Sequence, residues 1–163
     1  MSWWANKLRQ FRAHVRARVS ATERAEIAAW VAPAQLGLFD SMHVADQRHG
    51  LDVMATLRRQ GVTDSEVLLA GLLHDAGKGR EAGLLPRVAW SLGELYGRWV
   101  WSVAALFPVY GRALERLRTH AERSARLAAA AGCSLRTVEL IRNQSEPSDR
   151  EYGELLRLAD EAN

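Results

Sequence analysis

A histidine and an aspartate, His74 and Asp75, stand next to each other directly after the apolar run 67–73. Both side chains bind metal ions, the imidazole through a neutral nitrogen and the carboxylate through oxygen. Neighbouring residues on a regular helix point about 100° apart and therefore rarely bind one ion together. Gly77 is a helix stop signal, and at the end of a helix both side chains can reach one ion. The alternative is an ordinary helix end with chance polar residues.

Further residues of the same chemical types lie elsewhere on predicted helices: His49, His120 and Asp160. His49 lies one turn before Val53, on the apolar side of a helix predicted over about 45–59. An imidazole that faces the protein interior needs a polar partner, and a metal ion would supply one. These residues favour a metal site over a chance pair.

The constellation resembles the HD-domain superfamily of metal-dependent phosphohydrolases. The family pattern is a histidine on one helix, a His-Asp pair at the end of the next, and an aspartate on a late helix. Segment 69–78, LAGLLHDAGK, looks like the family signature almost residue for residue, and the resemblance covers roughly residues 46–163. It implies an all-α, single-domain helical bundle of the HD-domain type. It also implies four metal ligands, which are His49, His74, Asp75 and Asp160.

Such a mixed nitrogen and oxygen ligand set suits one divalent metal ion, with Mn, Fe, Zn, Ni, Co and Mg not distinguished. Phosphate esters resist attack by water, and an ion can lower the pKa of bound water from 15.7 to about 7. The resemblance therefore implies a phosphohydrolase that acts on a nucleotide or another small phosphate ester, with a metal-activated water as nucleophile. Phosphomonoesters and phosphodiesters are not distinguished. The alternative is a regulatory or ligand-binding module of the HD type with weak or no turnover.

Residues beside the ligands are predicted to carry the remaining roles. Asp75, Lys78 and His120 are the predicted catalytic residues, and His120 would act as a general acid or base or contact phosphate. Lys78 and Arg48 are the predicted contacts for the substrate phosphate. For His120 the alternative is a histidine on the helix surface, and for Arg48 it is an ordinary surface residue.

Some members of the family bind a second metal ion through histidines on later helices. His120 stands where the first of these would be. The next would fall in segment 142–147, which looks like the family's stretch before Glu-Pro but holds Gln144 and no histidine. Because glutamine is a poor metal ligand, one ion per chain is predicted.

The composition is ordinary for one globular domain: 163 residues, 48% of them hydrophobic and 25% charged. A single cysteine excludes an internal disulfide framework and fits a reducing compartment. The basic start is not followed by the apolar core of a signal peptide, and no run reaches the ~20 apolar residues that span a bilayer. These features predict a cytoplasmic protein.

The net charge of +3 is unevenly distributed along the chain. Residues 1–19 hold five basic residues and no acidic one, so the rest of the chain carries −2. This arm is predicted to be a basic amphipathic helix that docks on the body, residues 20–163; the alternative is that it lies on an anionic membrane surface. Nucleic-acid binding is a weaker interpretation, because it rests on the arm alone and no zinc finger or RNP-type motif is present.

Helix signals recur along the body, and no alternating strand pattern of useful length accompanies them. Capping boxes at 20–23 and 148–151 mark two helix starts, and Asp64 caps a third helix. A tryptophan-rich insert at about 80–111 departs from the family pattern. It is interpreted as a buried helix, as a lid over the substrate pocket, or as a surface at 85–110 that meets lipid or a partner.

Overall fold

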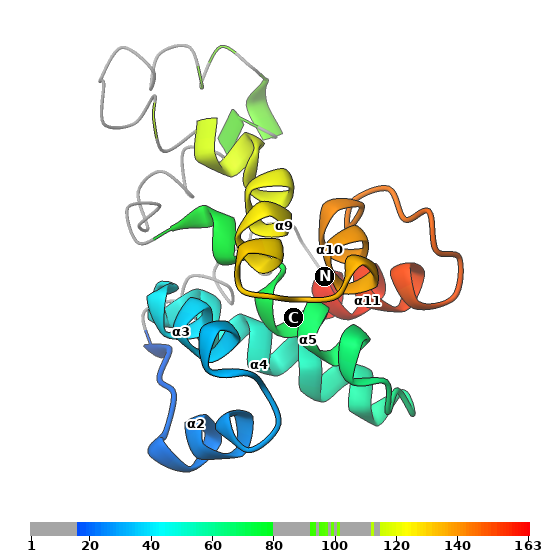
Figure 1. Ribbon diagram of the computed structural model, residues 1–163. Helices are drawn as coiled ribbons and strands as arrows, with labels where there is room; N and C mark the ends of the chain where they lie inside the picture. Colours follow the sequence, from blue (N-terminus) through cyan, green and yellow to red (C-terminus); the bar gives the residue numbers. More distant parts are fainter. Residues whose placement is uncertain are drawn as a thin grey trace.

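The computed structural model describes residues 16–79, 92–93, 95–97, 99, 101, 112 and 115–163. These residues form α-helices and one 3-10 turn, with no strand among them, which confirms the all-α prediction for this part of the chain (Figure 1). The elements are α2 (Ala21–Ala28), α3 (Pro33–Ser41), α4 (Val44–Arg59), α5 (Ser65–Leu73), η1 (Ala76–Lys78), α9 (His120–Ala130), α10 (Leu135–Arg142) and α11 (Tyr152–Ala162).

The starts of α2 and α5 follow the sequence signals. Ser20 Oγ accepts a hydrogen bond from the Glu23 N–H at 3.1 Å, and the Glu23 carboxylate accepts one from the Ser20 N–H at 2.9 Å. Asp64 caps α5 by accepting from the Glu66 N–H at 2.9 Å. Each cap satisfies a backbone donor that has no partner inside its helix. The predicted start signals are therefore confirmed at both helices.

The start of α11 differs from the prediction, because Ser148 does not cap this helix. Asp149 Oδ1 instead accepts hydrogen bonds from the N–H groups of Glu151 and Tyr152, at 3.0 and 2.9 Å. A carboxylate one residue further along satisfies the same donors and adds a favourable negative charge at the helix N-terminus. The capping box predicted at 148–151 is wrong, while the helix that it was taken to start is present.

The helix α5 is the buried centre of the described fold. All of its residues from 67 to 73 are buried, and α4, α10 and α11 all pack against it. The side chains of Val53 and Leu57 on α4 and of Leu156 on α11 surround Gly71. Truncating a large aliphatic side chain in such a core costs about 2–5 kcal/mol. This packing determines where the end of α5 lies relative to α4 and α11.

Two glycines allow neighbouring elements to approach closely. A Cβ at Gly50 would lie 2.4 Å from the Leu72 carbonyl oxygen, so α4 packs directly on the backbone near the end of α5. A Cβ at Gly77 would lie 2.4 Å from the His120 carbonyl oxygen, so η1 packs directly on α9. A larger residue at either position would push these elements apart. The two contacts bring α4, the end of α5 and α9 together.

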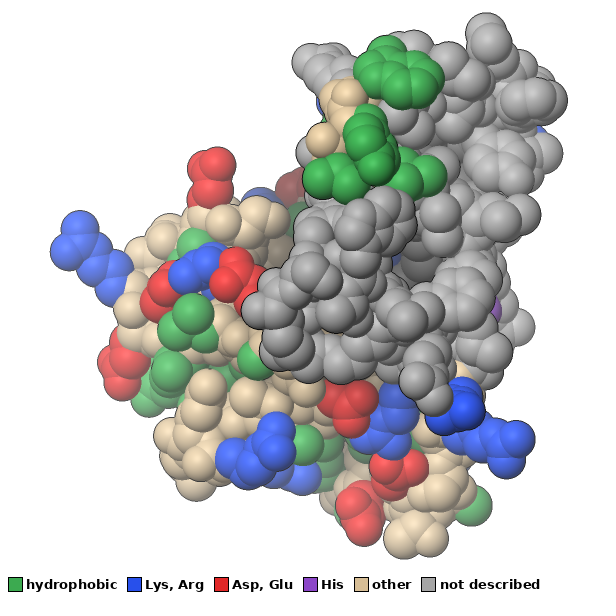
Figure 2. Space-filling view, turned by 180° about the vertical axis from the view of Figure 1, so that it is seen from behind, with side chains coloured by type: hydrophobic (Ala, Val, Ile, Leu, Met, Phe, Trp, Pro, Cys, Tyr) green, Lys and Arg blue, Asp and Glu red, His purple; other side chains and the backbone are tan. Residues whose placement is uncertain are grey.

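The described surface carries charges of both signs, and Figure 2 shows acidic and basic side chains interspersed over one face.

In the few described positions of the tryptophan-rich insert, Tyr96 is 55% and Trp99 64% exposed, so a fully buried helix does not describe these two residues. Most of the insert and most of the basic arm lie outside the described residues, and the lipid contacts predicted for 1–19 and 85–110 stay predictions. None of the described helices is long and apolar enough to cross a membrane.

Candidate metal centre

Three side chains from three helices meet at one point: His49 from α4, His74 from the end of α5, and Asp160 from α11. One ligand atom of each lies within 4.8 Å of the other two. Asp160 Oδ1 is 2.7 Å from His49 Nε2 and 3.4 Å from His74 Nε2. Ligand atoms of a first-row ion each lie about 2.0–2.2 Å from it, so two of them lie at most about 4.4 Å apart. The distances from Asp160 Oδ1 to the two histidine nitrogens are within this limit. The group could hold a divalent ion, whose identity the geometry leaves open.

The helix end at His74 is what allows this convergence. The helix α5 stops at Leu73, His74 is its C-cap, and Asp75 has left the helical conformation with φ −99° and ψ 4°. The predicted helix end is therefore confirmed. Nδ1 of His74 faces the Gly71 carbonyl at 2.9 Å and must carry the proton there. Its Nε2 is the nitrogen that faces the site, and an ion that bound there would displace any proton on it.

Nε2 of His74 is the atom that most strongly indicates a metal ion. The residue is 1% exposed, and this atom makes no hydrogen bond with the described residues. A buried polar atom left without a partner costs about 1–3 kcal/mol. Coordination to an ion would remove that cost, and the hydrogen bond from Nδ1 to a carbonyl is the kind that orients metal-binding histidines. The donor set therefore fits a first-row divalent ion.

Asp75 lies beside these three residues and is 2% exposed. Its Oδ1 is 3.6 Å from His74 Nε2, and its Oδ2 is 4.0 Å from His49 Nε2. Oδ2 also accepts a hydrogen bond from Lys78 Nζ at 2.5 Å. Asp75 thus borders the predicted ligands, and its own role as a ligand stays a prediction.

Burial and charge oppose each other throughout this cluster. Burial disfavours the charged form of His74, but the carboxylates of Asp75 and Asp160 outweigh it and raise the pKa of His74 to about 9. Burial also works against ionised Asp75, but the nearby Lys78 and histidines hold its pKa well below the usual range. For Asp160, burial works against the charged form, but a hydrogen bond from His49 and the charge of His74 lower its pKa. Both carboxylates are therefore ionised at neutral pH, as metal ligands must be.

His120 faces Asp75 from the start of α9. Its Nε2 lies 3.7 Å from Asp75 Oδ1, and its Nδ1 donates to the Leu117 carbonyl at 2.6 Å. Burial, followed by the charge of Lys78, lowers the pKa of this imidazole. The side chain is only 24% exposed, so it borders the site and not the outer helix surface. A neutral imidazole in this position presents a lone pair on Nε2 toward Asp75.

Gln144, which stands where the family has a histidine, is buried with its amide turned to the backbone. Nε2 donates to the His74 carbonyl at 3.3 Å and to the Ile141 carbonyl at 3.1 Å. Both hydrogens of the amide are used in this way. The structure therefore gives Gln144 a supporting position behind His74, with its amide nitrogen directed away from metal binding.

Arg48 lies next to His49 in sequence but is engaged elsewhere. Its guanidinium pairs with Glu23 of α2 at 2.5 Å and with Asp52 of α4 at 2.9 Å. These two carboxylates already use the groups that would hold a phosphate, and the pairing with Glu23 connects α2 to α4. A contact between Arg48 and substrate stays a prediction.

Two supporting residues carry no sequence signal that would have identified them. Ser124 is fully buried on α9, and its Oγ accepts from the Gly77 N–H at 2.8 Å, which ties η1 to that helix. Asn163 Nδ2 donates to Thr56 Oγ1 at 2.9 Å and holds the end of α11 against α4. Serine and asparagine are common at exposed positions, so only the fold reveals these contacts.

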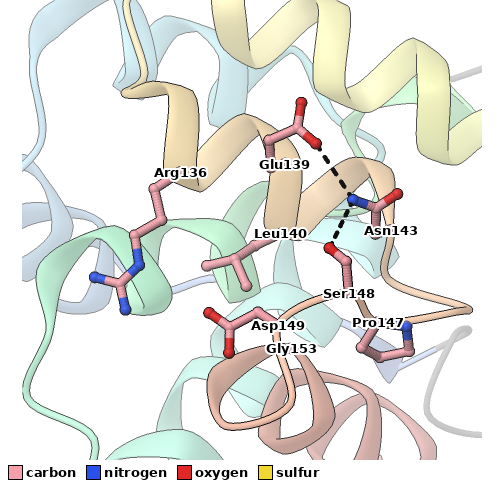
Figure 3. Close-up of a pocket in the computed structure, with 8 residues that line it drawn as sticks. All are labelled: Arg136, Glu139, Leu140, Asn143, Pro147, Ser148, Asp149 and Gly153. Atoms are coloured by element: carbon pink, nitrogen blue, oxygen red, sulfur yellow. Dashed lines mark hydrogen bonds between the residues drawn. The ribbon is translucent and has the colours of Figure 1, made fainter.

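A separate surface pocket lies between α10 and the start of α11 (Figure 3). Its lining residues are Arg136, Glu139, Leu140, Asn143, Pro147, Ser148, Asp149 and Gly153. Inside it, Asn143 Nδ2 donates to Glu139 and to Ser148, each at 3.3 Å. None of the predicted site residues lines this pocket.

Comparison with family models, with curated proteins and with solved structures gives no match to this chain. The resemblance to the HD-domain superfamily stays a prediction. The case for the metal centre rests on the positions of its residues.

Proposed function

We propose that the chain is a metal-dependent phosphohydrolase of the HD type, acting on a nucleotide or another small phosphate ester. One observation carries the proposal: His49, His74 and Asp160 converge from three helices around a buried Nε2 that lacks a hydrogen-bond partner among the described residues. A divalent ion held there would supply Lewis acidity toward a phosphoryl oxygen. In this proposal Asp75 Oδ1 is the fourth ligand, because it lies 3.6 Å from His74 Nε2.

The two remaining residues act on the substrate. The Lys78 ammonium has three donors and uses one on Asp75, so the others can bind a phosphate oxygen. His120 is placed to take a proton from the attacking water or to return one to the leaving group, since its Nε2 carries the lone pair. The substrate would therefore enter on the side of η1 and α9.

The alternative is a ligand-binding or regulatory module without turnover. One observation favours it: Lys78, the proposed phosphate contact, is already paired with Asp75 at 2.5 Å. A phosphate has to compete for an ammonium whose charge is largely neutralised by that carboxylate.

The test measures metal content together with phosphate release from a panel of nucleotides and small phosphoesters. His49→Ala and Asp160→Ala should lower both quantities. His43→Ala is the matched control, because His43 caps the start of α4 through its Nδ1, and it should keep the ion and the activity. A chain that binds the ion but releases no phosphate supports the binding module. A chain that binds no ion contradicts the proposed metal-dependent hydrolase.

A further inference from the structure

Asp75 is a buried carboxylate with a different partner on each oxygen. Oδ1 faces His74 Nε2 at 3.6 Å and His120 Nε2 at 3.7 Å. Oδ2 accepts from Lys78 Nζ at 2.5 Å. A carboxylate in such a position can connect two cations, one on each oxygen. Of the lysines and arginines in the described part of the chain, Lys78 is the one paired with it.

The backbone places the Lys78 ammonium at this oxygen. The turn η1 follows Asp75 directly, and the Lys78 N–H donates to the Asp75 carbonyl at 3.0 Å. Ser124 holds the middle of the turn through the Gly77 N–H, and Gly77 packs on the backbone of α9. The lysine side chain is 20% exposed, so water screens its pairing with the carboxylate only weakly. The pair is thus a fixed part of the site.

His120 supplies a second donor next to the same carboxylate. Its Nδ1 donates to the Leu117 carbonyl, which leaves the lone pair on Nε2. Two ligands that each lie about 2.1 Å from one ion can be no more than about 4.2 Å apart. The 3.7 Å between His120 Nε2 and Asp75 Oδ1 meets this limit. If the ammonium were absent, a second divalent ion could bind these two atoms, sharing Oδ1 with the first ion, and Oδ2 would be open to it as well.

We propose that the Lys78 ammonium takes the place of a second divalent cation beside Asp75. It supplies a fixed positive charge to Oδ2, while Oδ1 serves the metal ion of the proposed function, on which this inference rests. Gln144, a poor metal ligand, stands where the family has a histidine, and its amide nitrogen is held by two backbone carbonyls. The centre is therefore built for one metal ion and one lysine, and a substrate phosphate would meet the two charges from two sides.

The experiment counts Mn²⁺ ions per chain by calorimetric titration and by elemental analysis, after a chelator has removed bound metal. Wild type is expected to bind one ion. Lys78→Ala should bind two, the second more weakly, because the carboxylate and His120 are then free for a cation. The double variant Lys78→Ala with His120→Ala should return to one ion. Lys78→Arg keeps a positive charge and should also bind one.

A matched control separates loss of the ammonium from loosening of the turn. Ser124→Ala removes the hydrogen bond to the Gly77 N–H but leaves the lysine in the chain, so it should bind one ion. Circular dichroism establishes that each variant is folded. If Lys78→Ala does not fold, Lys78→Gln is measured in its place, because the glutamine is neutral and can still donate to Asp75.

The outcomes distinguish this inference from the proposed function. One ion in both wild type and Lys78→Ala, or two in wild type, would overturn the role of Lys78 and leave the metal centre standing. A second ion in Ser124→Ala would also overturn it, because the ammonium is still present there. Absence of any bound ion in wild type would contradict the metal centre and this inference together.

Discussion

His74 shows how single residues prepare a buried imidazole for a metal ion. Its ring is oriented by the Gly71 carbonyl, and its own carbonyl accepts from the Gln144 amide. Carbonyl groups at the end of a helix lack partners inside the helix, so this amide satisfies a group that burial would otherwise leave unpaired. Metal-binding histidines depend on such supporting contacts, and their loss typically lowers metal affinity 10- to 100-fold. Gln144 should therefore influence the ion without touching it.

The first prediction is that Gln144→Met lowers Mn²⁺ affinity by about tenfold or more. Methionine keeps the approximate volume and removes both donors. Gln47→Met is the matched control, since Gln47 Nε2 donates to the Phe39 carbonyl at 3.0 Å, at the end of a different helix. Both variants should lose some stability, of about 1–3 kcal/mol. Titration calorimetry should show weaker metal binding for Gln144→Met alone; equal affinity in the two variants would contradict a positioning role.

At the scale of the elements, α11 has to bring a ligand to the site from the last turn of its helix. An exposed last turn usually frays, and the ion alone would be a weak anchor in a chain that has not yet bound it. The structure supplies other anchors. Leu156 and Ala159 are buried, and Asn163 donates to Thr56 of α4. Asp160 is therefore held near His49 and His74 by packing and by hydrogen bonds.

The second prediction follows from this anchoring. Asp160→Asn keeps the shape of the side chain and removes its negative charge, so metal occupancy after desalting should fall strongly. The fold of α11 should persist, because the buried residues and Asn163 are untouched. When both proteins are free of metal, the rates of amide hydrogen exchange along α11 should be the same in Asp160→Asn as in wild type. Full occupancy in Asp160→Asn would show that this carboxylate is not a ligand.

The third prediction concerns the connection between α2 and α4. Hydrogen bonds from Arg48 and Ser20 lower the pKa of Glu23 from 4.5 to about 2. A carboxyl with a lower pKa in the folded state adds stability above pH 4.5 and loses that contribution as the pH falls toward 2. Glu23→Gln should therefore lower the free energy of unfolding at pH 7, and its difference from wild type should shrink toward pH 2.

Urea unfolding at pH 7 and at pH 3 measures this difference. Glu26→Gln is the control, because Glu26 is exposed on the same helix. A deficit of Glu23→Gln that is equally large at both pH values would contradict the linkage to ionised Glu23.

At the scale of the whole molecule, what could be predicted from the sequence depends on local patterns. The caps of α2 and α5 and the stop at His74 follow from residues a few positions apart. The choice of His49, His74 and Asp160 as candidate ligands follows from residue type and family pattern. The supporting contacts could not be found in this way. Ser124 and Gly77 are 47 positions apart, and Gln144 and His74 are 70 apart. Such contacts exist only once α9 and α10 have packed against the end of α5.

The same packing argument yields the last prediction, because the proposed ion would join α4, the end of α5 and α11. These helices are distant in sequence, and an ion that binds only the folded state stabilises it by about 2.7 kcal/mol at a hundred times its dissociation constant. A change of 1 kcal/mol shifts the melting temperature of a domain of this size by about 2–4 °C. Saturating Mn²⁺ should therefore raise the melting temperature by roughly 5–10 °C over the value in chelator. His49→Ala should remove most of this shift, whereas His43→Ala should retain it, because His43 caps α4 away from the ligands. A shift of equal size in both variants would place the stabilising ion somewhere other than at the convergence of these three helices.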